Sequence, residues 1–338
     1  MNLKSYSLKY VYTSILFLLV ANFCSAQDIL SIFATKGPNA QQSSLELFKR
    51  YTNPLAESYS WAISMGWNHT ARPHRPIGFD ISIGTAAVLI PDNKLTYSVD
   101  GIDGVRIISG NPQVPTFFGS NTASSVIGVK NDDGTESIIP ATRGVNLSAA
   151  PLPFFKFGLG VFKNTELMGR IFPKLEYNGM EIKMWGVGIK HNIIQWFYRE
   201  KSPFDLSVFA GYTQADGLYP LEQSMVAPVT NPGNMLFTTR GGDFEAILSK
   251  TFPLVTFYIS SGFAYSKNNL QLVGDYTLLY NKEESLNIPP NGVTEEYELK
   301  AWKFGGGIML KFGLVFINGD YSYSEYHLIS TGLGLTLK

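Results

Sequence analysis

Strict alternation of apolar residues with small or polar residues is the feature that most constrains what this sequence can fold into. It runs through several long segments, among them residues 77–84, 155–161, 255–266 and 302–312. Because successive side chains of a β-strand point to opposite faces, each segment has one apolar face and one small or polar face. The pattern therefore predicts an all-β fold.

A soluble β-sandwich and a transmembrane barrel both alternate in this way, and three features favour the barrel. The alternating segments run to about 10–14 residues, which suits a tilted crossing of the bilayer better than a soluble strand. Aromatic residues gather near the segment ends. Tight turns such as 163–165 and 251–253 alternate with long polar connections such as 216–234 and 267–296. We predict an antiparallel transmembrane β-barrel of about 12–14 strands with a short N-terminal helix.

Composition agrees with a barrel and excludes several other classes of protein. Charged residues make up 16% of the chain, against about 25% in ordinary soluble domains. The mean hydropathy of +0.02 is too low for a helical membrane protein with several spans. A formal net charge of zero gives no electrostatic footprint for nucleic acid, and we expect no nucleic-acid partner.

Residues 1–26 have the features of a secretory signal peptide. Lys4 and Lys9 give a basic start, residues 15–21 form an apolar core, and small residues precede a cleavage site after Ala26. The apolar run is too short to cross about 30 Å of hydrocarbon. Cys24 is the only cysteine, so the mature chain is expected to have neither disulfides nor thiolate metal sites.

Residues 27–58 are predicted to precede a barrel that occupies residues 59–338. Ser43 and Glu46 fit a capping box at the start of a short helix, and Pro54 is expected to end or kink that helix. The helix either folds into the lumen as a plug or packs below the barrel in the periplasm. Its apolar residues, the candidates for a plug, are Leu45, Phe48, Tyr51 and Leu55.

A polar cluster follows the predicted helix and consists of His69, Arg72, His74 and Arg75. Histidines near a carboxylate can serve in catalysis or bind a metal ion, but no spacing here fixes such a geometry. We interpret the cluster as an external loop between strands, solvated or bound to the phosphates of lipopolysaccharide. No catalytic, cofactor-binding or metal-binding residues are predicted, and we expect no enzymatic activity.

Charged residues in the alternating segments are candidates for lining the lumen. They would either set the selectivity of a pore or form an internal salt-bridge network that fills a closed barrel. The candidates are Asp80, Lys156, Lys190, Asp205, Lys303, Lys311 and Asp320.

Residues 51–91 resemble an uncharacterised family of outer-membrane β-barrels found in Bacteroidota-type bacteria, best in Tyr51-Thr52-Asn53-Pro54-Leu55 and Asn68-His69-Thr70-Ala71. That resemblance implies no established activity. More distantly, Asn53-Pro54-Leu55-Ala56 resembles the Asn-Pro-Ala element in the hatch of the long-chain fatty-acid transporter superfamily, from which it departs by an inserted leucine. Those proteins are 14-stranded barrels, and the resemblance implies passage of hydrophobic molecules.

Together these features predict a protein of the bacterial outer membrane that acts as a passive channel or transporter, with a hydrophobic small molecule as candidate ligand. The alternative is a non-transporting structural or assembly barrel whose external loops bind a partner. The expected partners are outer-membrane lipid, lipopolysaccharide and the barrel-insertion machinery. No cofactor is expected.

Overall fold

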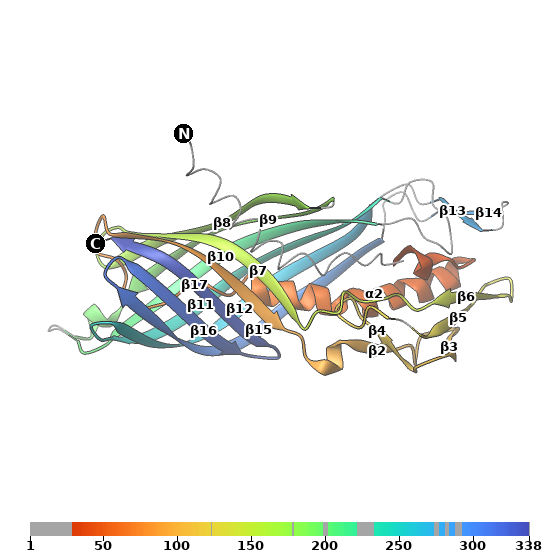
Figure 1. The fold of residues 1–338 in the computed structure, drawn as a ribbon, viewed down its shortest axis with the longest axis horizontal. Helices are drawn as coiled ribbons and strands as arrows, with labels where there is room; N and C mark the ends of the chain where they lie inside the picture. Colours follow the sequence, from red (N-terminus) through yellow and green to blue (C-terminus); the bar gives the residue numbers. More distant parts are fainter. Residues whose placement is uncertain are drawn as a thin grey trace, which may run out of the picture.

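The computed structural model describes residues 29–337, apart from 123, 178, 199–201, 222–232, 274–276, 281–283 and 288–292, so the predicted signal peptide lies outside the described residues. Its main feature is a barrel (Figure 1) built from β1 (Phe79–Leu89), β7 (Ala149–Gly160), β8 (Thr165–Tyr177), β9 (Met180–Asn192), β10 (Asp205–Pro220), β11 (Asn234–Thr251), β12 (Val255–Val273), β15 (Val293–Phe312), β16 (Val315–Tyr323) and β17 (His327–Leu337). Among the described residues, no helix combines the length and apolarity needed to cross a membrane.

The barrel closes because β1 pairs with strands on both sides. It is antiparallel to β17, with Phe79 opposite Leu337, and antiparallel to β7, with Phe79 opposite Leu159. The order around the barrel is β1, β17, β16, β15, β12, β11, β10, β9, β8 and β7. Closure leaves no barrel strand at the open edge of a sheet, as hydrocarbon demands. The predicted fold class is confirmed.

The barrel has ten strands, so the predicted count of 12–14 is wrong. Among the described residues, the remaining strands form three small sheets outside the barrel and are only three to five residues long, too short to cross a bilayer. Alternation alone does not reveal which sheet a segment joins. These strands are β2 (Thr96–Ser98) with β4 (Gln113–Pro115), β3 (Val105–Ser109) with β5 (Val126–Lys130) and β6 (Glu136–Pro140), and β13 (Thr277–Tyr280) with β14 (Glu284–Asn287).

The two ends of the barrel differ in their connections. The short-turn end carries the turns 161–164, 252–254 and 313–314 and both ends of the strand sequence, Phe79 and Leu337. The connection from β9 to β10 also lies there and contains the short helix η3 (Ile194–Trp196). The long-loop end carries β2 to β6 and the short helix η2 (Asp92–Lys94) in the connection from β1 to β7 (Figure 1).

The N-terminal helix α2 (Pro38–Ala62) follows a short helix η1 (Ile29–Phe33) and begins before the predicted capping box. Gly37 and Pro38 start it, and Asp132 accepts hydrogen bonds from the backbone N–H groups of Asn39 and Ala40. A distant aspartate in the turn after β5 thus caps the first turn. The prediction of Ser43 as N-cap is wrong, because its hydroxyl donates to backbone carbonyls instead.

Helix α2 also continues through Pro54, so of the two predicted effects, an end or a kink, the end is wrong. Every residue from Pro54 to Ala62 is buried, which means that the second half of the helix is covered on all sides. As a whole, α2 contacts the barrel strands β1, β7, β11, β12 and β15, and it contacts η1 and β5 at the long-loop end. Its second half runs into the barrel (Figure 1). Packing against the wall outweighs the hydrogen bond that proline removes.

Candidate functional site

A segment without helix or strand runs through the lumen from the end of α2 to the start of β1. It comprises residues 63–78, which we call the lumen segment, and residues 63–69 are buried. The chain therefore enters the barrel at the long-loop end and reaches the short-turn end before the first barrel strand begins. Its buried backbone has no secondary structure to satisfy its polar groups, which must find partners on the wall.

Each backbone carbonyl from Ile63 to Asn68 accepts a hydrogen bond from a side chain of the barrel wall, and two later carbonyls do the same. Because buried carbonyls require donors, this ladder fixes the path of the lumen segment. The donors are Arg170 to Ile63 and Met65, Lys303 to Ser64, Lys156 to Gly66 and Trp67, Tyr258 to Asn68, Lys190 to Thr70, and Ser207 to Ala71.

Lys303 is the centre of a buried ion cluster. Its Nζ lies 3.0 Å from Asp243 Oδ2 and 2.8 Å from Glu245 Oε1. The same ammonium donates to the Ser64 carbonyl at 2.6 Å, and Asn68 Nδ2 donates to Glu245 at 3.1 Å. Charges buried in this way need complete partners, and here the lumen segment supplies two of them.

Arg170 and Trp67 form a second contact between wall and lumen segment. The guanidinium carbon lies 4.1 Å from the centre of the Trp67 ring, a cation–π geometry. On its other side Trp67 packs against Phe209, with ring centres 5.3 Å apart. A Cβ atom on Gly188 or Gly211 would come within 3.2 Å of Trp67. These glycines provide the room that the indole occupies.

The external-loop position predicted for His69, Arg72, His74 and Arg75 is corrected by the structure. All four lie in the lumen segment, before β1, and not between two strands. His69 is buried, His74 is half-buried, and the two arginines are exposed at the short-turn end. The prediction treated residues after 59 as barrel, whereas residues up to Ala62 belong to α2.

Of the plug candidates in α2, only Leu55 belongs to the half that is buried on all sides. Phe48 packs against Phe33 of η1, with ring centres 5.7 Å apart. Tyr51 donates to the Arg143 carbonyl and packs against Phe117, both in the long connection from β1 to β7. Leu45 is half-buried. The predicted apolar face therefore packs mainly against the parts at the long-loop end.

The structure places four of the seven lumen candidates in buried contact with the lumen segment or with each other: Asp80, Lys156, Lys190 and Lys303. Asp205 pairs with Arg72 at 2.8 Å near the short-turn end. Asp320 accepts a hydrogen bond from Ser330. Lys311 is half-buried close to the turn that follows β15.

Sequence reasoning missed Glu166, Arg170, Asp243 and Glu245, which are buried and carry much of the ion network. Arg170 stands inside β8, Asp243 and Glu245 stand inside β11, and Glu166 stands at the start of β8. A charge in the middle of a membrane-spanning segment is itself a signal, because it must face the interior and find a partner.

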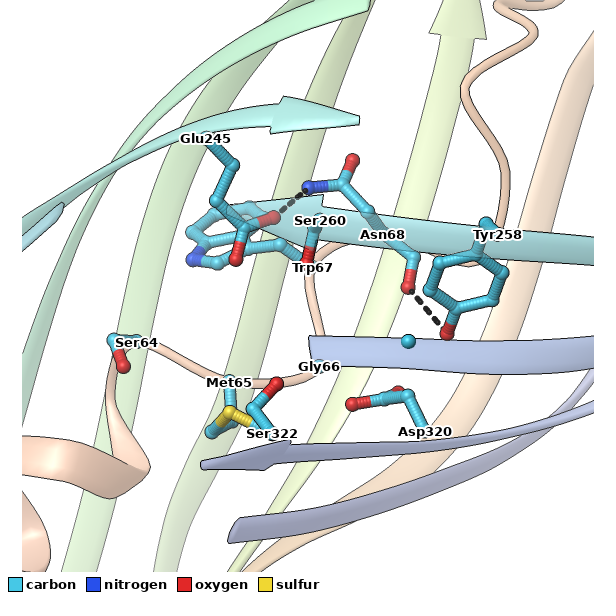
Figure 2. A pocket seen from close by; sticks show the side chains of 11 residues that line it. Ser64, Met65, Gly66, Trp67, Asn68, Glu245, Tyr258, Ser260, Asp320 and Ser322 are labelled. Atoms are coloured by element: carbon cyan, nitrogen blue, oxygen red, sulfur yellow. Dashed lines mark hydrogen bonds between the residues drawn. The ribbon is translucent and has the colours of Figure 1, made fainter. Parts of the chain in front are cut away.

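A small cavity lies between the lumen segment and the wall beside Ser64. Figure 2 shows a cavity bounded by Ser64, Met65, Tyr258 and Asp320. Its volume is about 20 Å³, which is the space for roughly one water molecule. Beside Ser64 the lumen segment thus lies close against the wall.

Comparison with solved structures finds other barrels at low similarity. The translocator domain of the autotransporter NalP from Neisseria meningitidis is 12% identical, with 86% of this chain and 99% of that chain covered and a TM-score of 0.39. Ail of Yersinia pestis is 9% identical, with 77% and 97% covered and a TM-score of 0.29. The toluene transporter TbuX of Ralstonia pickettii is 9% identical, with 83% and 97% covered and a TM-score of 0.25.

These neighbours include an adhesion-type protein, a translocator and a transporter, and at such TM-scores they assign no activity to this chain. No curated protein matches the sequence. A family model does match, over residues 6–337. The chain therefore belongs to the family of unknown function DUF6588.

Proposed function

We propose that this protein is a non-conducting barrel of the bacterial outer membrane that holds a small domain at the cell surface for binding a partner. The observation that carries this proposal is the ladder of wall side chains bound to successive carbonyls from Ile63 to Asn68. A segment bound at every residue by buried donors is a permanent part of the lumen.

The bound lumen segment argues against the passive channel that the sequence suggested. A hydrophobic solute needs an apolar path, whereas the cavity beside Ser64 is about 20 Å³ and is bordered by Glu245 and Asp320. Opening a path would require the ion cluster around Lys303 to come apart, and breaking a buried ion pair costs about 3–5 kcal/mol. Transport is therefore the less favoured function.

The domain proposed for display consists of η1, the first half of α2 and the strands β2 to β6. The capping of α2 by Asp132 and the hydrogen bond from the Phe117 N–H to the Tyr51 carbonyl join these parts. In outer-membrane barrels the longer loops lie outside the cell and the short turns in the periplasm. This domain at the long-loop end would then face the medium and lipopolysaccharide.

The proposal includes no catalytic activity. His69 and Asp80, the pair closest to a catalytic arrangement, are buried and engaged with Lys156 and His74. Outer-membrane lipid and the barrel-insertion machinery remain the expected partners of the apolar outer wall.

Conductance across planar lipid bilayers tests whether the lumen is closed. We expect the folded wild type to show no steady conductance. The double variant Arg170→Ala, Lys303→Ala should show openings, because the carbonyls of Ile63, Ser64 and Met65 lose their donors. Lys300→Ala, an exposed position on the same strand as Lys303, should stay silent. A steady conductance of the folded wild type, or uptake of a hydrophobic solute by wild-type liposomes, would refute the closed-barrel proposal.

Epitope insertion tests the orientation. Gly134 and Gly313 lie in turns at opposite ends of the barrel, both with positive φ and open surroundings. A tag after Gly134 should be recognised by antibody on intact cells, and a tag after Gly313 only after permeabilisation. The reverse pattern would place the domain in the periplasm and contradict the display proposal.

A further inference from the structure

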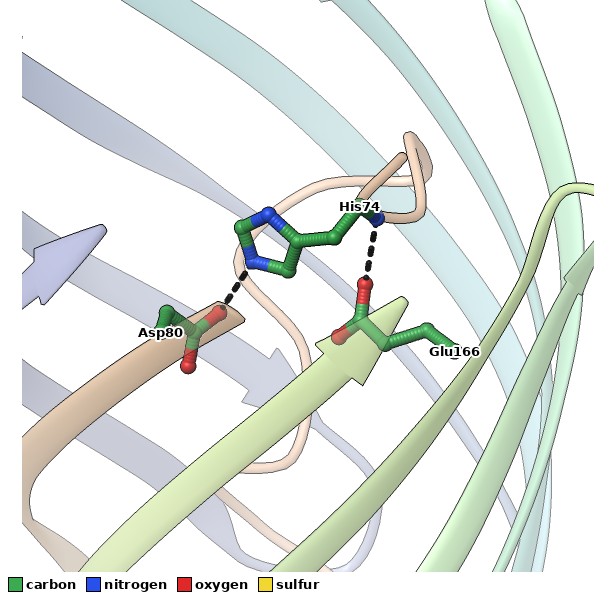
Figure 3. Close-up of side chains that lie close together, drawn as sticks. All are labelled: His74, Asp80 and Glu166. Atoms are coloured by element: carbon green, nitrogen blue, oxygen red, sulfur yellow. Dashed lines mark hydrogen bonds and ion pairs between the residues drawn. The ribbon is translucent and has the colours of Figure 1, made fainter. Parts of the chain in front are cut away.

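Three potential metal ligands meet at the short-turn end of the barrel. His74 comes from the lumen segment, Asp80 from β1 and Glu166 from β8, and one ligand atom of each lies within 4.8 Å of the other two (Figure 3). His74 Nε2 is 2.8 Å from Asp80 Oδ2. The backbone N–H of His74 donates to Glu166 Oε2 at 3.0 Å. Three segments distant in sequence thus bring their donor atoms to one point.

The wall leaves room for this cluster through two glycines of β7. A Cβ on Gly158 would come within 2.9 Å of Glu166 Oε1 and 3.3 Å of Asp80 Oδ2, so this glycine allows the two carboxylates to approach each other. A Cβ on Gly160 would overlap the backbone of His74. Side chains at these positions would exclude the cluster.

One carboxylate oxygen in the cluster lacks a partner. Asp80 is fully buried, and its Oδ1 accepts no hydrogen bond from any described residue. Buried carboxylate oxygens are rarely left unsatisfied, and an ion is one common explanation. The side chain of His74 is 18% exposed, so the cluster is accessible from solvent at the short-turn end.

The neighbouring groups orient the ligands as an outer shell does around protein metal sites. Lys156 Nζ lies 3.2 Å from His69 Nδ1 and donates to it, which leaves the His69 proton on Nε2, 3.6 Å from Asp80 Oδ2. His69 therefore turns an N–H toward Asp80 without reaching hydrogen-bond distance, and it does not compete as a ligand. Lys190 lies 3.3 Å from Glu166 Oε1 and holds that carboxylate in place.

We propose that His74, Asp80 and Glu166 bind one divalent transition-metal ion, with solvent completing the coordination. One imidazole and two carboxylates suit zinc, whose ligand distances are about 2.0–2.2 Å. The ion would bridge Asp80 and Glu166 and so reduce the repulsion between these close carboxylates. It would also join the end of the lumen segment to β1 and β8, and its role is structural.

Titration of the chelator-treated, detergent-solubilised chain with zinc chloride tests the site by calorimetry and by metal content after washing. We expect one zinc ion per folded chain, and a rise in the thermal unfolding temperature on zinc addition. His74→Ala and Glu166→Gln should each weaken binding by about 100-fold or more, beyond the 10–100-fold typical of outer-shell changes, and remove the zinc-dependent stabilisation.

His191→Ala is the matched control, because His191 also lies at the short-turn end but bonds to Thr165 outside the cluster. It should bind zinc as the wild type does. Folding of each variant is verified by its heat-modifiable migration in detergent gels, so that a loss of binding in an unfolded variant is not counted. Absence of saturable zinc binding by the folded wild type, unchanged binding by His74→Ala, or loss of binding by His191→Ala would each overturn the proposal.

Discussion

The two faces of the barrel wall are made from the same strands and yet follow different rules. On the outer face, side chains such as Ile259 and Trp302 are more than half exposed and would meet lipid, where any apolar side chain of similar size serves. On the inner face, side chains such as Lys303, which follows Trp302 in the chain, lie at hydrogen-bond distance from particular partners. The outer face thus depends on residue class, and the inner face depends on individual residues.

This difference has an energetic cause. The outer face loses little when one apolar residue replaces another, because the contacts with lipid are nonspecific. A buried charge that loses its partner, in contrast, has neither water nor a counter-ion. Substitutions on the two faces should therefore differ in the kind of change that is tolerated.

The largest effect is expected from Lys303→Met. It leaves Asp243 and Glu245 without their buried cation and removes the donor to the Ser64 carbonyl, and such losses cost about 3–5 kcal/mol. Lys300→Met breaks an exposed pair with Glu298 and a contact with the Tyr265 ring, and it should cost much less because water screens such surface pairs. Urea unfolding in detergent micelles, followed by tryptophan fluorescence, measures both. Equal effects would mean that the inner face is no more specific than the surface.

A charge on the outer face comes next. Ile259 on β12 and Ile138 on β6 are equally exposed, at 61% and 62%, but only Ile259 is expected to face lipid. Ile259→Lys should destabilise the barrel in lipid vesicles by about 2–4 kcal/mol if the site is near the midplane. Ile138→Lys should change stability by less than about 0.5 kcal/mol. A small effect at Ile259 would remove it from the membrane-facing band.

Gly66→Ala tests the tight fit of the lumen segment. Gly66 has φ +75°, and a Cβ there would overlap the ring of Phe154. We expect a cost of about 2–3 kcal/mol from left-handed strain together with overpacking. Gly134 has φ +84° and open space around it, so Gly134→Ala introduces left-handed strain without overpacking. It should cost about 1–2 kcal/mol. Thermal unfolding of the two variants compares them, and a larger loss for Gly134→Ala would contradict the packing argument.

The smallest effect is expected from Tyr326→Phe. The Tyr326 hydroxyl donates to Glu57 of α2, and burial beside that carboxylate raises the pKa of Tyr326 far above its ordinary value. The stabilisation, about 1 kcal/mol, should be complete below the ordinary tyrosine pKa of about 10 and disappear as pH rises through the raised pKa. The free energy of unfolding should therefore fall less steeply between neutral and strongly alkaline pH for Tyr326→Phe than for Tyr323→Phe, an exposed control.

Sequence reasoning succeeded for long, regular segments and failed for short ones. The alternation in 155–161 and 255–266 lies in β7 and β12, as expected of barrel strands. The strands near residues 105–140 have weaker β patterns and belong to two separate sheets, β2 with β4 and β3 with β5 and β6. Local pattern gives the two faces of a strand, but it does not name the neighbouring strand, so the strand count was too high.

The helix shows the same limit. Ser43 and Glu46 satisfy the local pattern of a capping box, yet Gly37, Pro38 and the distant Asp132 start the helix. Pro54 satisfies the local pattern of a helix end, yet the wall that surrounds it keeps the helix intact. Both errors arise where a contact between residues far apart in sequence outweighs the local preference.

The sequence by itself determined that the chain forms a closed antiparallel barrel with an apolar outside, because a period of two residues assigns each side chain to a face without reference to any other segment. Only the tertiary structure decided that ten strands close the barrel and that residues 63–78 thread the lumen. The positions of His69 and His74 followed from that threading. Such features depend on which distant groups can satisfy a buried carbonyl or charge, and that information resides in pairs of residues far apart in the chain.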